Sequence, residues 1–318
     1  MRRTSIAIAA LALGLSVHAD TSKTISRTFD VGDGGTIRLN ADVGDVHVTS
    51  GGSGKVTIEI IRRARNAEDL NRNEVTFSQS GSDVTVRSRY ENERHGWFNW
   101  NEHGIDIDYN IRIPARYNVD LHTSGGDIEG GNVGGNADVN TSGGDVKLTR
   151  VGGNLRAHTS GGDISLDSAT GTANLNTSGG DIEIREAGSN VEAKTSGGSI
   201  EIHRAGGTVM ARTSGGSIRI DDATDTVDAQ TSGGSITAHF SRQPRGDSRL
   251  ATSGGGVTVE LAPSIGAELD ARASGGGVRA DVPVTVQGKQ DDDSLVGRIN
   301  GGGPRLVLRT SGGGITVR

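Results

Sequence analysis

Four aspartates recur at a fixed interval and could bind a metal ion. They are 18 residues apart and each follows a Gly-Gly pair: Asp127, Asp145, Asp163 and Asp181. If each interval forms one layer of a stack, neighbouring carboxylates lie about 4.8 Å apart, and such oxygen-rich rows suit calcium. Later intervals replace the aspartate by serine, which accepts a hydrogen bond from a turn N–H but carries no charge. The replacement favours a capping role in the turns, with a calcium row as the alternative.

A second group of candidate residues lies in one segment, 91–104, where the surrounding pattern breaks. It holds two tryptophans, a phenylalanine and two histidines: His95, Trp97, Phe98, Trp100 and His103. Aromatic side chains with hydrogen-bonding groups suit stacking on sugar rings or insertion into a partner protein. The alternative is a cap over an exposed edge, which repeat proteins need. The two histidines alone do not indicate a metal site, because no third ligand is evident.

Catalytic signatures are missing from the sequence. It has no nucleophile elbow, no phosphate-binding loop and no metal-binding helix of the His-Glu type. An outward column that includes Glu183, Glu201 and Arg219 varies in charge and indicates a solvated face. The tripeptide Arg245-Gly246-Asp247 matches an integrin-binding motif, but a chain rich in these residues contains it by chance. We expect no enzyme. A carbohydrate-active enzyme on a β-helix scaffold is the alternative.

The element that must position these residues is a repeat of 18 residues. The turn motif Thr-Ser-Gly-Gly begins at seven equally spaced positions: Thr123, Thr141, Thr159, Thr177, Thr195, Thr213 and Thr231. A short fixed period predicts one structural unit stacked on itself. Within residues 136–153, two runs alternate between apolar and polar residues, as strands with one buried face do. The unit divides as nine plus nine, which favours two strands per coil over a three-sided hexapeptide helix.

The repeat also predicts the core and the turns. Stacked coils place seven β-branched residues in one buried column: Ile128, Val146, Ile164, Ile182, Ile200, Ile218 and Ile236. Each repeat threonine has the parity of the buried residues, so we expect it to point inward and bond the turn backbone, rather than to form an outward ice-binding array. Glycine adopts positive φ freely, so the Gly-Gly pairs predict tight turns of that kind. Parallel crossovers predict right-handed winding.

These patterns predict an all-β, single-chain parallel β-solenoid of one domain, residues 20–318. Residues 20–117 read as irregular coils that include the loop 91–104 and one short helix within 64–73. Residues 118–240 carry the exact repeats, and residues 241–318 carry looser C-terminal coils. Early echoes of the repeat are Gly44-Asp45-Val46 and Thr49-Ser-Gly-Gly52, the second read as a copy of the turn.

Composition bounds the environment of the protein. Residues 1–19 resemble a secretory signal: two arginines, a short apolar run and a small-residue cleavage site ending at Ala19. We therefore expect export to the periplasm or the cell surface. The 318-residue chain has no cysteine, so no disulfide framework or cysteine zinc site is available. The net charge of −6 argues against nucleic acid as a partner. The apolar run is too short to span a bilayer, and no other follows.

Four stretches carry a likeness to a known family. They are Phe29-Asp-Val with Gly35-Thr-Ile-Arg-Leu39, then Ile113-Pro-Ala-Arg, the serial Thr-Ser-Gly-Gly-Asp-Ile units, and Gly297-Arg-Ile-Asn-Gly301 with residues 306–317. In these the chain resembles a bacterial family of adhesin-like proteins with β-strand repeats, a glycine-rich domain of unknown function. The resemblance implies a β-solenoid of the cell envelope with no catalytic residues and no cofactor. We therefore expect an exported, non-enzymatic scaffold or binding protein, whose partner is an unidentified glycan or protein, with a calcium-stabilised rod as a further alternative.

Overall fold

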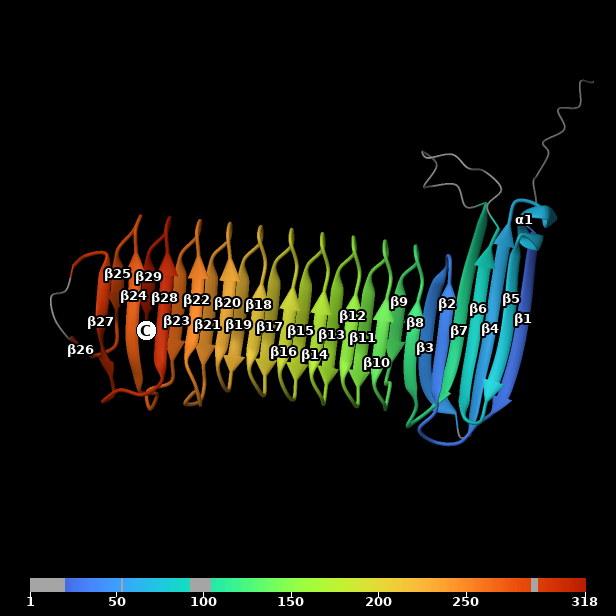
Figure 1. Ribbon diagram of the computed structural model, residues 1–318, viewed down its shortest axis with the longest axis horizontal. Helices are drawn as coiled ribbons and strands as arrows, with labels where there is room; N and C mark the ends of the chain where they lie inside the picture. Colours follow the sequence, from blue (N-terminus) through green and yellow to red (C-terminus); the bar gives the residue numbers. More distant parts are fainter. Residues whose placement is uncertain (1–20, 53, 92–103, 287–290) are drawn as a thin grey trace, which may run out of the picture.

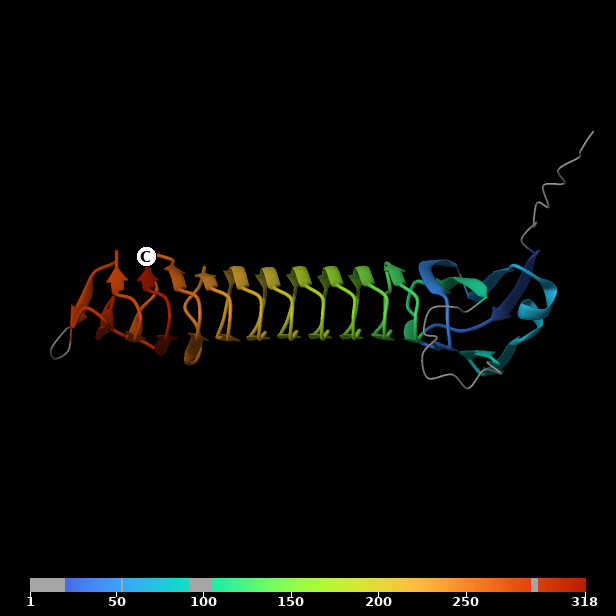
Figure 2. The ribbon, with the colours of Figure 1, turned by 90° about the horizontal axis from the view of Figure 1, so that it is seen from above.

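The protein is a long rod built from two facing β-sheets (Figure 1). The computed structural model describes residues 21–52, 54–91, 104–286 and 291–318. Sheet A has 14 strands and sheet B has 15. Seen from above, the sheets form two layers joined by short turns, and the middle of the rod is straight (Figure 2). The all-β solenoid prediction is confirmed. The expected signal segment, residues 1–19, lies outside the described residues.

The regular part of the rod has one strand in each sheet per coil, as the nine-plus-nine division predicts. In sheet B its strands are β8 (Asn118–His122), β10 (Ala137–Asn140), β12 (Leu155–His158), β14 (Ala173–Asn176), β16 (Val191–Lys194), β18 (Val209–Arg212) and β20 (Val227–Thr231). In sheet A they are β9 (Ile128–Gly131), β11 (Val146–Val151), β13 (Ile164–Ala169), β15 (Ile182–Ala187), β17 (Ile200–Ala205), β19 (Ile218–Ala223) and β21 (Ile236–Phe240). Neighbours within each sheet pair in parallel.

The core follows the predicted column. Ile164 pairs with Ile182, and Ile182 pairs with Ile200, so identical side chains stack in register. Each of these three is about 1% exposed. Because the side chains of a strand alternate between faces, the same register leaves every second residue of these strands on the outer faces of the rod. The outer faces are therefore also arranged in columns. Right-handed winding and the domain limits stay predictions.

The repeat glycines serve close approach between coils, and not positive φ as the sequence suggested. None of the glycines in residues 118–240 has a positive φ. At Gly162 an added Cβ would lie 2.2 Å from the carbonyl oxygen of Gly144 in the preceding coil. At Gly161 it would lie 3.6 Å from the nearest atom, an oxygen of Gly143. The second glycine of each pair is therefore required by the 18-residue stacking itself.

The N-terminal end is a cap that departs from chain order. The first coil, β2 (Thr36–Ala41) and β3 (Asp45–Gly52), stacks directly on β8 and β9. Beyond it, sheet A continues with β7 (Ile105–Pro114), β4 (Lys55–Ala64) and β1 (Thr21–Asp30), and sheet B with β6 (Asp83–Tyr90) and β5 (Asn73–Ser80). The antiparallel pairs β1–β4, β4–β7 and β5–β6 terminate the parallel stack.

The cap confirms two details of the sequence reading and corrects a third. The short helix is α1 (Ala67–Asn71), and Asn66 caps it by accepting the N–H of Asp69 at 2.9 Å. Gly44 and Asp45 hold the positions of a repeat turn. Thr49-Ser-Gly-Gly52 is not the turn copy that the sequence predicts, because it forms the end of β3. The next strand in the chain, β4, belongs to the same sheet, so the chain does not cross to the other sheet there.

The C-terminal end also departs from chain order. Its strands are β22 (Ser248–Thr252), β23 (Val257–Leu261), β24 (Ala267–Ala273), β25 (Val278–Ala280), β26 (Val284–Val286), β27 (Ser294–Ile299), β28 (Arg305–Thr310) and β29 (Ile315–Val317). The coil β28–β29 lies between β22–β23 and β24–β25. Each coil presents the same ladder and apolar column, so alternation alone does not specify which coil is its neighbour. Beyond β24, β27 pairs antiparallel with β24, and β26 pairs antiparallel with β27.

Candidate functional site

The aromatic candidates cannot be placed. His95, Trp97, Phe98, Trp100 and His103 all lie outside the described residues. The flanking strands show only where the segment starts and ends. It connects Tyr90 at the end of β6 in sheet B to Ile105 at the start of β7 in sheet A, both in the N-terminal cap. Its role as a binding loop or an edge cap stays a prediction.

The aspartate column forms a hydrogen-bonded ladder along one edge of the rod. Oδ1 of Asp145 accepts the backbone N–H of Asp163 at 2.8 Å, and Oδ1 of Asp163 accepts that of Asp181 at 2.7 Å. The ladder begins earlier, at Asp45, whose Oδ1 accepts the N–H of Asp127. It continues past the last aspartate through serine hydroxyls, the N–H of Ser217 being donated to Ser199 at 3.2 Å. Aspartate and serine thus make the same contact, as expected for turn capping.

The threonines form a second ladder, inside the same turns. Oγ1 of Thr159 donates to the carbonyl of Gly144 at 2.8 Å, and it accepts the N–H of Gly162 at 3.3 Å. Thr159 is fully buried, and the other repeat threonines are at most 7% exposed. Each hydroxyl therefore links two successive coils. The inward orientation predicted from parity is confirmed, and the threonines are a structural row rather than an exposed binding array.

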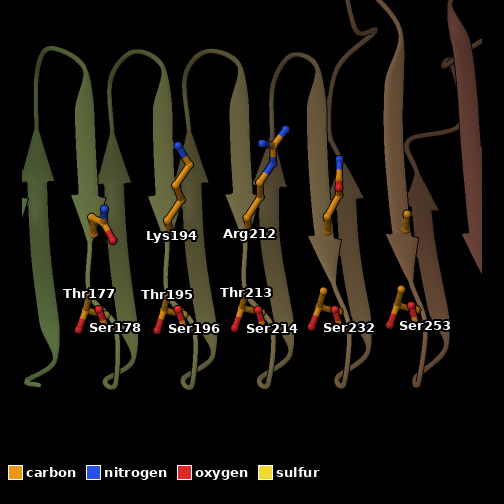
Figure 3. A pocket seen from close by; sticks show the side chains of 15 residues that line it. Thr177, Ser178, Lys194, Thr195, Ser196, Arg212, Thr213, Ser214, Ser232 and Ser253 are labelled. Atoms are coloured by element: carbon orange, nitrogen blue, oxygen red, sulfur yellow. The ribbon is translucent and has the colours of Figure 1, made fainter. Parts of the chain in front are cut away.

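The serines next to these threonines are exposed and border a groove over sheet B (Figure 3). The groove has a volume of about 580 Å³ and crosses five successive coils at the ends of β14, β16, β18, β20 and β22. Its walls are the Thr-Ser pairs of these coils and the residue before each pair: Asn176, Lys194, Arg212, Gln230 and Ala251. Figure 3 shows the serines and threonines in one row, with Lys194 and Arg212 above them.

The groove is polar and its charged lining groups are cations. Lys194 forms an ion pair with Glu192, and Arg212 forms one with Asp228 at 2.9 Å. These two carboxylates belong to a neighbouring column and do not line the groove. The side chain of Lys194 is 40% exposed and that of Arg212 is 44% exposed, so each cation keeps N–H donors available to a ligand. The groove can therefore offer hydroxyls, amides and two cations at the spacing of the coils.

A family comparison covers nearly all of this structure. The Toastrack DUF4097 family model matches residues 35–318. The chain belongs to this family. The match spans the first coil, the regular rod and the inserted C-terminal coil, so the resemblance seen in the sequence is confirmed for a family of unknown function. None of the curated proteins matches the chain significantly.

Solved structures of similar fold are distant from this Toastrack chain. A candidate cell adhesion protein from Clostridium sporogenes is 12% identical over 93% of this chain and 99% of its own, with a TM-score of 0.29. A candidate adhesin from Bacteroides fragilis is 16% identical over 93% and 97%, with a TM-score of 0.42. A candidate lipid-binding protein from Parabacteroides distasonis is 14% identical over 93% and 97%, with a TM-score of 0.33. Likenesses this distant carry no information about what this chain binds.

The integrin-like tripeptide of the Toastrack chain has a structural role. The guanidinium of Arg245 binds the nearly buried carboxylate of Asp225, with Nε 2.8 Å from Oδ2. This hydrogen bond lowers the pKa of the Asp225 carboxyl. Asp247 accepts the backbone N–H of Arg305 at 2.9 Å. Both charged residues of the motif thus hold the loop before β22 against the rod.

A small pocket near the C-terminal end is lined by two carboxylates, the feature that an enzyme would need. Glu268 and Asp270 line a space of about 170 Å³. Asp270 pairs with Arg309 at 2.6 Å, and Glu268 lies 3.6 Å from Arg298. The volume is below the roughly 300 to 1,000 Å³ of ordinary ligand pockets.

Among the described residues no helix is long and apolar enough to cross a bilayer.

Sequence reasoning missed one cluster on sheet A. Glu201, His203 and Asp221 each place a ligand atom within 4.8 Å of the others. The varying charge along the column of Glu201 predicts a solvated face. The available signal was that Asp221 follows His203 by one period of 18 residues, so that the two lie side by side on adjacent strands.

Proposed function

We propose that this Toastrack protein is an exported, adhesin-like binding rod of the cell envelope, without enzymatic activity, that holds an extended glycan along the groove of sheet B. The observation that carries the proposal is the repetition of one polar arrangement over five coils. A rod that offers the same groups at each coil matches a ligand that also repeats. Adhesion is the use that such a surface supports best.

The repeated groove favours an elongated ligand over a compact one. Each coil contributes one exposed serine hydroxyl, such as Ser196 or Ser214, and four of the five coils add an outward polar side chain, the fifth having Ala251. A single hydroxyl contributes only about 0.5 to 1.5 kcal/mol to a complex. Linked contacts along one polymer act together and raise the overall affinity by orders of magnitude. The two ladders keep the lining rigid, which reduces the entropy that binding must overcome.

The two cations define the chemistry of the ligand. Lys194 is the last residue of β16 and Arg212 is the last residue of the neighbouring strand β18. The two are direct partners across the strands. Charge-assisted hydrogen bonds to carboxylates or phosphates are about twice as strong as neutral ones. The residue before each Thr-Ser pair is never acidic in the coils of the groove, and the carboxylates that pair with the two cations belong to the neighbouring column. We therefore expect a linear glycan with acidic groups.

The lining of the groove supports binding rather than hydrolysis. Glycoside hydrolases use a pair of carboxylates on either side of the scissile bond. No aspartate, glutamate or histidine is among the residues that line this groove. The segment 91–104, at the far end of the rod, would add a second contact through its aromatic residues. That contribution is part of the proposal and rests on residue types alone.

The test compares binding of an acidic and a neutral linear polysaccharide, polygalacturonate and dextran, to the full mature chain. The variant Lys194→Ala/Arg212→Ala should weaken polygalacturonate binding at least 10-fold, because each lost charged hydrogen bond contributes about 1.5 to 3 kcal/mol. The matched control is Lys147→Ala/Arg150→Ala, which removes two cations from β11 on sheet A. Equal binding by both double variants, or shortening of the polymer during incubation, would contradict the proposal.

Export is tested separately, by treating intact cells and cells with an opened envelope with protease. Digestion in intact cells would support a surface adhesin, and digestion only after opening would support a periplasmic scaffold. Resistance in both, with digestion only after lysis of the inner membrane, would contradict export.

A further inference from the structure

The outer face of sheet A carries a compact group of metal-ligating side chains. Glu201 and His203 are two residues apart on β17, so both point outward, and Asp221 lies beside them on β19. One ligand atom of each lies within 4.8 Å of the other two. The side chains of all three are 33% to 46% exposed, so an ion from solvent can reach them. This face is opposite to the groove.

The imidazole of His203 is held in one orientation. Its Nδ1 lies 2.9 Å from Oδ2 of Asp221, and Oδ1 of Asp221 lies 2.7 Å from Nε of Arg219. Both oxygens of this carboxylate are therefore occupied. A carboxylate that accepts one ring N–H leaves the other ring nitrogen with its lone pair, which is the usual arrangement around metal-binding histidines. Asp221 thus positions the ring, and Nε2 is the ligand atom.

Nε2 of His203 faces a second carboxylate across a gap. Oε1 of Glu183 on β15 lies 3.8 Å away, which is too long for a hydrogen bond. A zinc ion bonds nitrogen at about 2.0 to 2.1 Å and carboxylate oxygen at about 2.0 to 2.2 Å, so a bent nitrogen–metal–oxygen link spans a separation of this size. Glu201 is available as a third ligand, because its distance of 3.6 Å from Arg219 also exceeds a hydrogen bond.

The surrounding charges leave room for a cation of charge two. Glu183 and Glu201 are direct partners on adjacent strands, an arrangement that is repulsive for like charges. Two arginines compensate part of this charge. Arg185 lies 3.5 Å from Asp167 and 3.6 Å from Glu183, and Arg219 lies near Glu201 and Asp221. Four carboxylates therefore share two guanidinium groups, and the local excess is two negative charges.

We propose that His203, Glu183 and Glu201 bind a divalent transition metal of the zinc type, with Asp221 as the residue that positions the imidazole. An imidazole ligand favours zinc and its neighbours over calcium, which takes oxygen ligands. The ligands come from β15 and β17 and the positioning residue from β19, so the ion ties three coils together. The site is independent of the glycan groove.

Isothermal titration with zinc chloride tests the site in the mature chain. The background variant His95→Gln/His103→Gln removes the two histidines of the segment outside the described residues. In it we expect one zinc ion per chain. His203→Gln should abolish this binding, and Glu183→Gln should weaken it. Asp221→Asn should lower the affinity about 10- to 100-fold, because it weakens the contact that positions the imidazole and leaves the three ligands in place.

The matched control is His47→Gln. His47 is also half-exposed on sheet A, and its Nδ1 lies 3.3 Å from Glu129, but within the described part of the chain it belongs to no cluster of three possible metal ligands. This variant should bind zinc normally. Imidazole nitrogen resonances give a second readout, since zinc should shift Nε2 of His203 and leave its Nδ1 protonated. Absence of zinc binding, binding that survives His203→Gln, or binding lost in His47→Gln would each overturn the proposal.

Discussion

The carboxylate of Asp163 accepts the backbone N–H of Asp181 at 2.7 Å, one full coil further along the rod. The same contact links every aspartate of the column to the next, and serine hydroxyls continue it where the aspartates end. Each carboxylate is thereby stabilised by an N–H dipole of its neighbour. This contact supports the capping interpretation of the row, and the calcium row stays the alternative prediction.

Substitution of Asp163 separates capping from calcium binding. Asp163→Asn keeps an acceptor oxygen and should leave the urea midpoint nearly unchanged, whereas Asp163→Ala should destabilise the rod by about 1 kcal/mol. Neither midpoint should depend on added calcium. A wild-type midpoint that rises with calcium, together with an Asn variant as unstable as the Ala variant, would favour the calcium row instead.

Thr159→Val should destabilise the rod more than any change to the adjacent serine. The valine is close in size but leaves the carbonyl of Gly144 and the N–H of Gly162 without their partner, at a cost of about 1 to 3 kcal/mol in unfolding free energy. Ser160→Ala is the control, because Ser160 is exposed. Chemical denaturation followed by circular dichroism measures both. Equal effects of the two changes would be inconsistent with the buried ladder.

The two glycines of one turn should respond differently to alanine. Gly162→Ala places a methyl group 2.2 Å from a backbone oxygen, so the coils must separate locally, and we expect a loss of about 1 to 3 kcal/mol or more. Gly161→Ala meets its nearest atom at 3.6 Å and should be tolerated. Thermal unfolding of the pair checks this. If both variants melt like the wild type, close stacking does not explain why every repeat turn of this chain has a glycine at this position.

The ion pair of Asp225 should make stability depend on pH in the acid range. Arg245 lowers the pKa of this carboxyl in the folded state. The pair therefore contributes stability above the unfolded value of about 3.9, and this contribution is lost as the pH falls through the lower folded value. Urea midpoints measured from about pH 6 down to pH 2 should fall for the wild type, and part of that fall should be absent in Asp225→Asn. Parallel profiles for the two proteins would contradict the assignment.

The sequence was sufficient for the regular rod because every coil repeats one environment. Alternation around Val146 and Ile164 defines which residues are buried, and the 18-residue period defines their register. The same uniformity means that the sequence does not specify the order of the strands at the two ends of the rod. The strand that contains Leu306 and Leu308 fits any coil equally well, so its place between β22 and β24 depends on which loops can reach. The cluster around His203 was hidden for another reason, since its members are close only after two coils are stacked.

The candidate groove could be anticipated only in part. The sequence shows the Thr-Ser pairs, and the parity of the strands predicts that the threonine of each pair is buried. Parity does not predict that the exposed serines border a continuous groove. Lys194 and Arg212 occupy a position that is histidine, asparagine, glutamine or alanine in the other coils from β8 to β22, so their type gave no signal. Their importance comes from being on adjacent strands at one place along the rod.

The position of β28–β29 inside the stack has a consequence for biosynthesis. A ribosome delivers residues in order, so the regular rod can grow coil by coil from β8–β9 to β22–β23 while the chain is still being made. The strands β24 and β25 then emerge before the coil on which they must rest. They have no final place until residues 305–317 are released. This end of the rod can therefore close only after residues 305–317 have been synthesised. A chain that stops before them keeps an open sheet edge that proteases and chaperones can recognise.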